Sequence, residues 1–307
     1  MPATRPPALA VDVGGTKLAA ALVDGEGRLT WQARVPTPGA GEAEALWATL
    51  ATMVAGAPPG AEVCGVSCAG PMDTAAGLVS PLNIPAWRGF PLRDRLAAAT
   101  GLPTWLDNDA KALALGEGLF GAAVGRRSYL SMVVSTGVGG GIVLDGRLLD
   151  GDGGNAGHIG HLIVEPGGRR CACGAHGCLE AEASGTAVAA VTGAPAAAAG
   201  PEVRARVGTL VGRAVASVAN LLDLRLAAVA GSVALGYGEE FFGPAQEEVD
   251  RCARLAFSAG TRIVASALGA DGPLVGAAAV AWWGAGVASL GSPPSSPSPV
   301  APSPPGP

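Results

Sequence analysis

Val11 to Leu29 reads VDVGGTKLAAALVDGEGRL, and Val133 to Leu149 reads VVSTGVGGGIVLDGRLL. Both segments consist of an apolar strand, a glycine turn, a second apolar strand, an Asp-Gly turn and an Arg-Leu pair. A unit repeated more than a hundred residues later predicts that the chain has two related halves. Each glycine turn would present backbone N–H groups, which a polyphosphate held between two lobes requires.

Either segment alone is also consistent with an ordinary hairpin whose glycines permit a positive φ. The matched pair favours phosphate binding, because Gly137 to Gly141 holds four glycines and a two-residue turn needs one or two. The sequence contains no G-x-x-x-x-G-K-[ST] string, which excludes a Walker A loop. The glycine run leads into the β-rich IVLDG and not into a helix, which disfavours a dinucleotide fingerprint.

Strands and helices alternate around the two hairpins, and such alternation predicts an α/β fold. We expect strands over residues 9–13, 18–23, 63–67 and 104–106, and helices over residues 42–55, 92–100 and 109–117.

The 307 residues, 49% of them hydrophobic, suffice for one large domain or two medium ones. Lysine occurs only at Lys17 and Lys111, so the chain has no basic strip of the kind that binds nucleic acid. No export signal is expected, because Asp12 interrupts the short apolar stretch from Ala8 to Val11. We therefore expect a cytoplasmic protein whose cysteines are thiols or metal ligands and not disulfides.

The C-terminal part of the chain is apolar and then rich in proline. Leu274 to Leu290 has no charged residue, and we interpret it as a packed helix, with a short membrane span as the alternative. Ser292 to Pro307 contains only small residues, proline and one valine, and is expected to be disordered. We predict an N-terminal lobe over residues 1–116, a C-terminal lobe over residues 117–291, with the last helix free to pack back on the first lobe, and a tail over residues 292–307.

Asp107, Asn108 and Asp109 follow an apolar strand and precede a helix. Carboxylates at such a junction point into the crevice where ligands bind in open α/β sheets. One of them could accept the proton of a substrate hydroxyl while the asparagine orients that hydroxyl. Helix capping is an equally good explanation of these residue types, so the spacing alone leaves both open.

A second cluster has the composition of a zinc site: His161, Cys171, Cys173 and Cys178. One imidazole and three thiolates make a complete tetrahedral set with no open position, so the ion would be structural. A redox disulfide and ordinary buried thiols are the alternatives, and the nearby histidine and the expected compartment favour the metal. His176 is a possible substitute ligand, and His158 is expected to face the crevice.

Together these motifs resemble the ROK family of sugar kinases and repressors. The resemblance runs from Leu9 to Trp283 and rests on Asp12-Val-Gly-Gly-Thr-Lys17, Asp107-Asn-Asp109, Ser135-Thr-Gly-Val-Gly-Gly-Gly141, Ala156-Gly-His-Ile-Gly-His161 and Cys171-Ala-Cys-Gly-Ala-His-Gly-Cys-Leu-Glu180. It implies an actin-like ATPase (ribonuclease H-like) fold of two lobes, with ATP and sugar in the cleft between them.

The resemblance also implies roles for individual residues. Asp109 would be the catalytic base, which takes the proton of the sugar hydroxyl as it attacks the γ-phosphoryl group. The implied sugar contacts are Asn83, Asn108, His158, His161 and Glu180, and the implied zinc ligands are His161, Cys171, Cys173 and Cys178. The first phosphate loop would be Asp12, Gly14, Gly15, Thr16 and Lys17, the second Thr136, Gly137, Gly139 and Gly140, and the nucleoside turn Gly231 and Ser232. A Mg²⁺ ion is expected with the ATP.

Three positions depart from the family pattern. His158 stands where many family glucokinases have glutamate, and the His-Ile-Gly-His string is more similar to bacterial N-acetylmannosamine kinases, whereas Leu106 to Ala110 is glucokinase-like. Ala230 replaces a glycine that is common in the nucleoside turn. Lys111 stands where the family often has a small or amide side chain, and it would lower the pKa of Asp109 if it turned toward that carboxylate.

These observations predict an ATP-dependent kinase of a hexose or an N-acylhexosamine, with glucose or N-acetylmannosamine as substrate and the 6-hydroxyl as acceptor. The alternative is a catalytically idle sugar-binding sensor, which the intact Asp109 and both phosphate loops disfavour. A DNA-binding repressor is not expected, because the first phosphate strand begins at Leu9. Partners should be small molecules and not nucleic acid or membrane, and a homodimer is the default expectation for a soluble enzyme.

Overall fold

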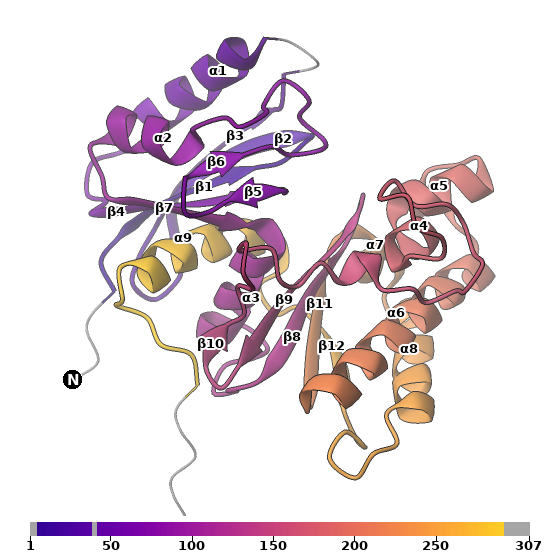
Figure 1. Cartoon of the computed structure of the whole chain (residues 1–307). Helices are drawn as coiled ribbons and strands as arrows, with labels where there is room; N and C mark the ends of the chain where they lie inside the picture. The colour runs from indigo at the N-terminus through magenta and orange to yellow at the C-terminus, as the bar shows by residue number, and fades with distance from the viewer. Residues whose placement is uncertain (1–4, 39–41, 292–307) are drawn as a thin grey trace, which may run out of the picture.

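The computed structural model describes residues 5–38 and 42–291, and these residues form two lobes, each built on a five-stranded sheet (Figure 1). The first sheet contains β1 (Ala8–Val13), β2 (Lys17–Val23), β3 (Leu29–Pro36), β4 (Val63–Cys68) and β7 (Thr104–Asn108). The second contains β8 (Tyr129–Val134), β9 (Val138–Leu144), β10 (Arg147–Leu148), β11 (Leu226–Ala230) and β12 (Arg262–Ala265). The tail predicted over residues 292–307 lies outside the described residues.

The two sheets have the same topology. The strand order is β3-β2-β1-β4-β7 in the first and β10-β9-β8-β11-β12 in the second. In the first sheet β1 and β2 form an antiparallel hairpin, and β4 and β7 continue the sheet in parallel on the other side of β1. In the second sheet β8 and β9 form the hairpin, and β11 and β12 continue in parallel on the other side of β8. The duplication predicted from the two glycine hairpins is therefore confirmed, because both hairpins open equivalent sheets.

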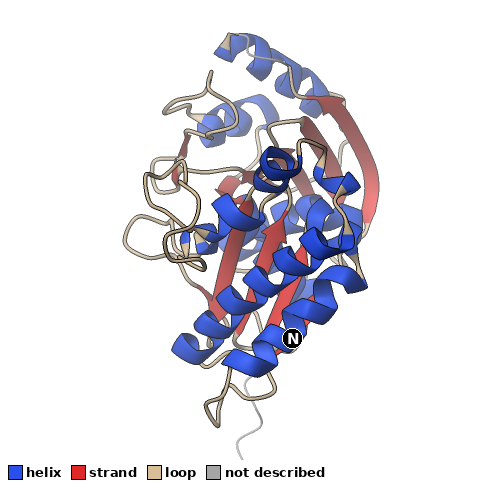
Figure 2. Ribbon diagram, turned by 90° about the vertical axis from the view of Figure 1, so that its right-hand side faces the viewer, coloured by secondary structure: helices blue, strands red, loops and turns tan. Residues whose placement is uncertain are grey.

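Helices cover the outer face of each sheet (Figures 1 and 2). The larger helices are α1 (Ala43–Ala55), α2 (Leu92–Thr100), α3 (Asp109–Phe120), α5 (Gly185–Thr192), α6 (Pro201–Leu222), α8 (Glu239–Cys252) and α9 (Gly272–Gly284). The short elements are β5 (Met72–Asp73), β6 (Leu78–Val79), α4 (Leu179–Ala183), α7 (Ser232–Tyr237), and 3₁₀ turns at Ile159–His161, Ala196–Ala198 and Gly269–Asp271. In α6, Val207, Leu210, Val211, Ala214 and Val218 recur at helical spacing and are buried in the core of the second lobe.

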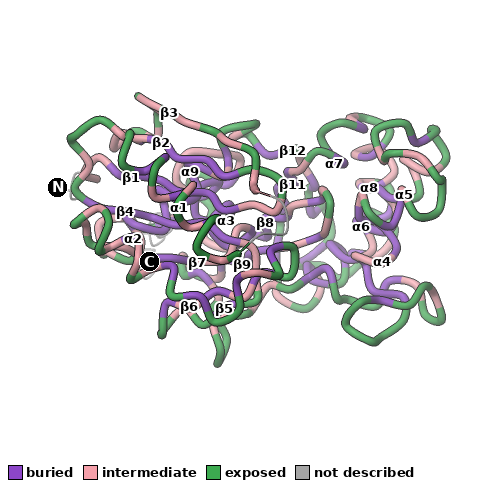
Figure 3. Tube along the Cα trace, turned by 90° about the horizontal axis from the view of Figure 1, so that it is seen from above, coloured by how far each residue is buried: buried purple, intermediate pink, exposed green. Residues whose placement is uncertain are grey.

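The helices α3 and α9 lie between the two sheets, and together they form the core that joins the lobes (Figure 1). Both are rich in alanine and glycine, so their backbones can approach their neighbours closely. A Cβ at Gly65 of β4 would collide with the carbonyl oxygen of Ala277 in α9. Figure 3 shows β1, β2 and β4 mostly in the colour of buried residues, and α9 packs against these three strands.

The apolar C-terminal stretch predicted as a helix over residues 274–290 is helical only to Gly284, the end of α9, and this helix packs on β1 and β4 of the first sheet. Nowhere in residues 5–38 and 42–291 does a helix combine the length and the apolar composition needed to cross a membrane. The predicted lobe boundary at residue 116 falls inside α3, which contacts both sheets, and the boundary itself stays a prediction.

Candidate active site

Three polar side chains stand in register at the carboxyl ends of parallel strands. Asp12 of β1 pairs with Ser67 of β4, and Ser67 pairs with Asp107 of β7. The Asp12 carboxylate accepts a 3.0 Å hydrogen bond from the Ser67 hydroxyl, and both residues are buried. Ser67 was not among the residues predicted for the site, since a single serine in an apolar strand is no motif.

The structure shows which residue of the Asp107 to Asp109 junction caps the following helix. Strand β7 extends two residues beyond the predicted end at 106, because Asn108 pairs with Cys68 of β4. Asn108 is the N-cap of α3, and its Oδ1 accepts a 3.0 Å hydrogen bond from the Ala110 N–H. Asn108 therefore caps the helix through its Oδ1, and Asp109 is the first residue of the helix.

Asp109 and Asp12 are both carboxyl groups with raised pKa values. Burial raises the pKa of Asp109 to about 6, against hydrogen bonds from the backbone N–H groups of Ala110 and of Asp109 itself and from Asn108. Burial likewise raises the pKa of Asp12 to about 6, where the Ser67 hydrogen bond opposes the shift and the charge of Asp109 adds to it. A carboxyl group with a pKa near 6 can accept a proton near neutral pH.

The first glycine turn is closed by hydrogen bonds to its own backbone. The Gly14 N–H donates to the Lys17 carbonyl oxygen at 3.0 Å, and the Thr37 hydroxyl donates to the Gly14 carbonyl oxygen at 2.7 Å. A Cβ at Gly15 would lie 2.7 Å from Nδ2 of Asn83. The fold therefore brings Asn83, predicted as a sugar contact, against the turn predicted to bind phosphate, and it needs glycine at position 15.

The second glycine turn packs against the start of α3. A Cβ at Gly139 would lie 3.0 Å from the Ala110 Cβ, and one at Gly141 would lie 2.7 Å from the Ala110 carbonyl oxygen. Glu180 reaches the same turn, because its Oε2 accepts a 2.9 Å hydrogen bond from the Val138 N–H. The turn thus lies beside Glu180 and beside Ala110, the residue that follows Asp109.

A hollow of about 400 Å³ adjoins the second turn and is lined by Ser135, Thr136, Gly185, Thr186, Ala189, Ala196, Ser232 and Val233. The hydroxyl groups of Ser135 and Ser232 lie 2.9 Å apart, and the Thr186 hydroxyl donates to the Thr136 carbonyl oxygen at 2.9 Å. Gly231 has φ +101°, and a Cβ there would collide with the Val134 carbonyl oxygen. Thr136, Gly231 and Ser232 are brought together as predicted, whereas the apolar lining from α5 and α7 had no signal in the sequence.

Asn108 and His158 lie beside Gly70. A Cβ at Gly70 would lie 3.3 Å from Nδ2 of Asn108 and 3.9 Å from Nε2 of His158. Nδ1 of His158 lies 2.8 Å from the Asn155 carbonyl oxygen, which can only accept, so Nδ1 carries the proton. The rings of His158 and His161 are nearly parallel, with centroids 6.2 Å apart.

The ligand atoms of His161, Cys171, Cys173 and Cys178 all lie within 4.8 Å of one another. The Cys171 Sγ is 3.7 Å from His161 Nδ1, and the Cys173 Sγ is 3.7 Å from the Cys178 Sγ. Ligand bonds of the usual zinc lengths in a tetrahedron would separate two sulfur atoms by about 3.8 Å. The four residues therefore fit a zinc ion, and none of the six cysteines is in a disulfide. His176 lies outside the cluster, so it is not the substitute ligand that the sequence left possible.

Lys111 does not face Asp109. Its ammonium group contacts Oδ1 of Asp107 at 3.0 Å and Oδ1 of Asp150 at 2.7 Å, and it donates to the Gly154 carbonyl oxygen at 3.1 Å. The expectation that it would lower the pKa of Asp109 if it turned toward that carboxylate therefore does not apply. The side chain packs along α3 toward the residues that follow β10.

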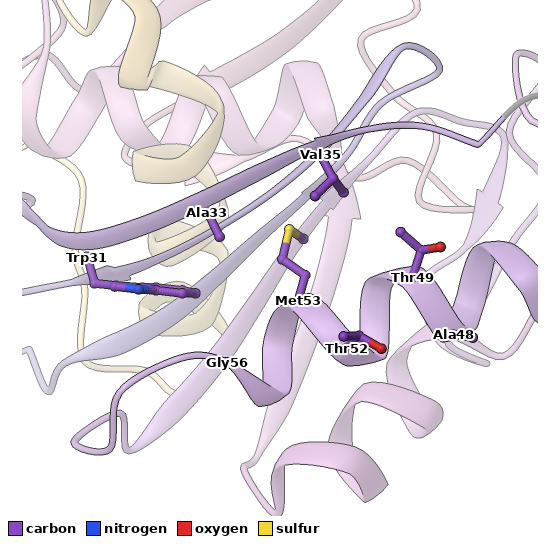
Figure 4. Close-up of a pocket in the computed structure, with 8 residues that line it drawn as sticks. All are labelled: Trp31, Ala33, Val35, Ala48, Thr49, Thr52, Met53 and Gly56. Carbon is purple, nitrogen blue, oxygen red and sulfur yellow. The ribbon is translucent and has the colours of Figure 1, made fainter.

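Another hollow, of about 570 Å³, lies between β3 and α1 (Figure 4). It is lined by Trp31, Ala33, Val35, Ala48, Thr49, Thr52, Met53 and Gly56. None of these residues is titratable near neutral pH, and none is among the predicted site residues. The chemistry of the molecule therefore lies at the glycine turns and not in this hollow.

Two lobes with the same strand order, each containing a glycine hairpin, fit the actin-like ATPase fold, and the similarity to named kinases makes this protein a carbohydrate kinase of that fold. The chain belongs to the ROK family, whose model matches residues 8–283.

Named relatives are similar over most of the chain. An N-acetylmannosamine kinase from Citrobacter koseri is 39% identical over 246 residues, which cover 75% of this chain and 84% of that protein. A glucokinase from Thermotoga maritima is 33% identical over 306 residues, which cover 89% and 96%. The crystal structure of a ROK family glucokinase from Streptomyces griseus in complex with glucose and AMPPNP superposes with a TM-score of 0.78 at 32% identity, covering 90% of this chain and 99% of that one.

Proposed function

We propose that this kinase transfers the γ-phosphoryl group of ATP to the 6-hydroxyl of N-acetylmannosamine or glucose. The observation that carries the proposal is Asp109, a half-buried residue whose carboxyl group has its pKa raised to about 6 by burial and which precedes Ala110, the residue packed against the second glycine turn. Asn108 and His158 converge next to it and supply polar groups for sugar hydroxyls. The similarity to an N-acetylmannosamine kinase and to two glucokinases supports these two substrates.

In this mechanism Asp109 accepts the proton of the 6-hydroxyl as the oxygen attacks phosphorus. The backbone N–H groups of the two glycine turns, with Lys17 and Thr136, would hold the phosphates, and Ser232 and Gly231 would flank the nucleoside. Asp12 offers the oxygen ligand that Mg²⁺ prefers, and the ion supplies neutralisation of phosphate charge when it is bound with ATP. Asn83, Asn108, His158, His161 and Glu180 would orient the sugar, which is the main requirement of phosphoryl transfer.

The zinc ion that His161, Cys171, Cys173 and Cys178 would hold has a structural role in this proposal. Bound to these four residues, the ion would hold together the loop that precedes Glu180 and would fix the position of His161, whose ring stacks with that of His158. A cytoplasmic location, a homodimer and the absence of nucleic-acid partners stay predictions, and light scattering after size-exclusion chromatography tests the dimer.

The direct test is ADP release with a panel of sugars, with ATP and polyphosphate compared as donors. Turnover of N-acetylmannosamine or glucose with ATP, and a product phosphorylated at carbon 6 by NMR, is the expected result. Tight sugar binding without turnover of any member of the panel would instead favour the idle sensor.

We expect His158→Glu to shift sugar preference toward glucose. The resemblance places His158 beside the sugar, where many glucokinases have glutamate, and a carboxylate accepts hydroxyl hydrogen bonds on two oxygens. The ratio of kcat/KM for glucose to that for N-acetylmannosamine should rise by about tenfold. His176→Glu in the exposed zinc loop is the matched control, and an unchanged ratio in His158→Glu would remove the specificity role.

The value of kcat/KM for the sugar should rise with pH through about 6. The base must be deprotonated to act, and burial raises the pKa of Asp109 to about 6, so acid protonates it and stops turnover. A pH profile of kcat/KM for the sugar, in a buffer series of constant ionic strength, measures this rise. A profile that is flat between about pH 5 and pH 8 would contradict the assignment.

A further inference from the structure

Lys111 is a lysine buried in the protein interior, with 1% of its surface exposed. Lysine is rarely buried to this extent unless its charge is paired. An ammonium group has three donors, and here it has three acceptors, which are Oδ1 of Asp107, Oδ1 of Asp150 and the Gly154 carbonyl oxygen. Its hydrogen-bonding capacity is therefore fully used.

The acceptors belong to two parts of the candidate site. Asp107 lies near the end of β7, and the same Oδ1 accepts a 2.7 Å hydrogen bond from the Asn108 N–H. Asn108 and Asp109 follow it directly. Lys111 thus contacts Asp107, whose side chain hydrogen-bonds the backbone of Asn108 just before Asp109.

The other two acceptors lie in residues 150–157, the connection between β10 and His158. This connection is held together by hydrogen bonds from Ala156 N–H to the Asp150 carbonyl oxygen and between Asn155 and the His158 ring. Residues 150–153 and 155 are exposed, so apolar burial contributes little to their position. A Cβ at Gly154 would lie 2.7 Å from the Thr74 hydroxyl oxygen, so the connection also passes against the first lobe.

We propose that Lys111 is a positioning residue for sugar phosphorylation, which ties residues 150–157 to the β7–α3 junction and so sets where His158 stands relative to Asn108 and Asp109. The inference rests on the proposed kinase function. Removing the ammonium group would leave Asp107 buried without its counter-charge and would release Asp150 and Gly154 from the junction. Binding of the sugar should then weaken. Binding of the nucleotide should not, because its predicted site lies in the second lobe around Ser232.

The test compares Lys111→Met, Asp150→Ala and the double variant with the wild type, because alanine removes the oxygen that accepts the 2.7 Å hydrogen bond from Lys111. Asp150 is the sharper probe, since its side chain is 63% exposed and its replacement keeps the Lys111 to Asp107 pair. We expect the sugar KM to rise by about tenfold in each single variant, with the ATP KM changed by less than about twofold. Hydrogen exchange in peptides covering residues 150–157 should be faster in both.

The double variant should resemble Lys111→Met, because the two groups act through one contact. The control is Arg127→Met, which removes an exposed ion pair of 3.7 Å with Asp145 and should change neither KM nor exchange at 150–157. Equal increases in the sugar and ATP KM values, additive effects, or unchanged exchange would overturn the proposal. If Lys111→Met does not fold, Asp150→Ala decides alone.

Failure of the proposed function looks different. A wild-type protein without turnover on any sugar would refute the proposed kinase function. The role of Lys111 in sugar phosphorylation would then be refuted as well. The exchange measurement would still report whether Lys111 holds the connection.

Discussion

Asp109→Asn should lower kcat by about a thousandfold, while sugar and nucleotide still bind. Asparagine has the shape of aspartate and keeps an oxygen that can accept the 2.8 Å hydrogen bond from the Ala110 N–H, so the start of α3 should be preserved. Its amide cannot take the proton of the attacking hydroxyl. The loss should therefore appear in kcat and not in the dissociation constants.

Coupled ADP release at saturating substrates measures kcat, and calorimetry measures binding of the sugar and of a non-hydrolysable ATP analogue. The matched control is Asp94→Asn, an exposed aspartate on α2 that pairs with Arg93. Its activity should equal that of the wild type. Retention of most of the activity in Asp109→Asn would show that another group is the base.

Cys178→Ser should lower the melting temperature by about 10 °C and release the metal. Cys178 is buried, and a serine hydroxyl is a poor substitute for the thiolate that a tetrahedral zinc site requires. Metal-binding free energy is folding free energy when the site does not exist in the unfolded chain. Activity should fall as well, because His161 shares the cluster with Cys178 and stacks near His158.

Elemental analysis should find about one zinc per chain in the wild type and much less in the variant. Cys252→Ser is the control, since Cys252 is a partly buried free cysteine outside the cluster. It should keep the metal and nearly the wild-type melting temperature. Metal-free wild-type protein with full activity and an unchanged melting temperature would refute the structural zinc.

The two glycine hairpins are a feature that local sequence predicts correctly. Their repeated pattern predicted two equivalent halves, and the common strand order of the two sheets confirms this. The pattern is readable because strand alternation and glycine turns are short-range properties of the chain. The zinc ligands were predictable for a similar reason, since the donor atoms define the chemistry and most of them lie in one loop.

The junction at Asp107, Asn108 and Asp109 is a feature whose roles local sequence could not assign. Aspartate and asparagine both cap helices and both bind ligands, so residue type could not separate the two explanations. The pairing of β7 with β4 separates them, because it extends the strand to Asn108 and leaves Asp109 as the first residue of α3. The raised pKa of Asp109 likewise follows from burial between two lobes, which no local window contains.

The sequence by itself determined the α/β class and the two halves, and it predicted the four residues of the zinc cluster, because these depend on residue type and short-range spacing. The choice of Asp109 as the predicted base came from the family resemblance and not from spacing. Only the tertiary structure decided that Asn83 meets Gly15, that Ser67 supports Asp12, and that Lys111 turns to Asp107 and Asp150 and away from Asp109. These contacts join segments far apart in the chain. They exist because α3 and α9 pack between the two sheets and so set which strand ends and connections meet.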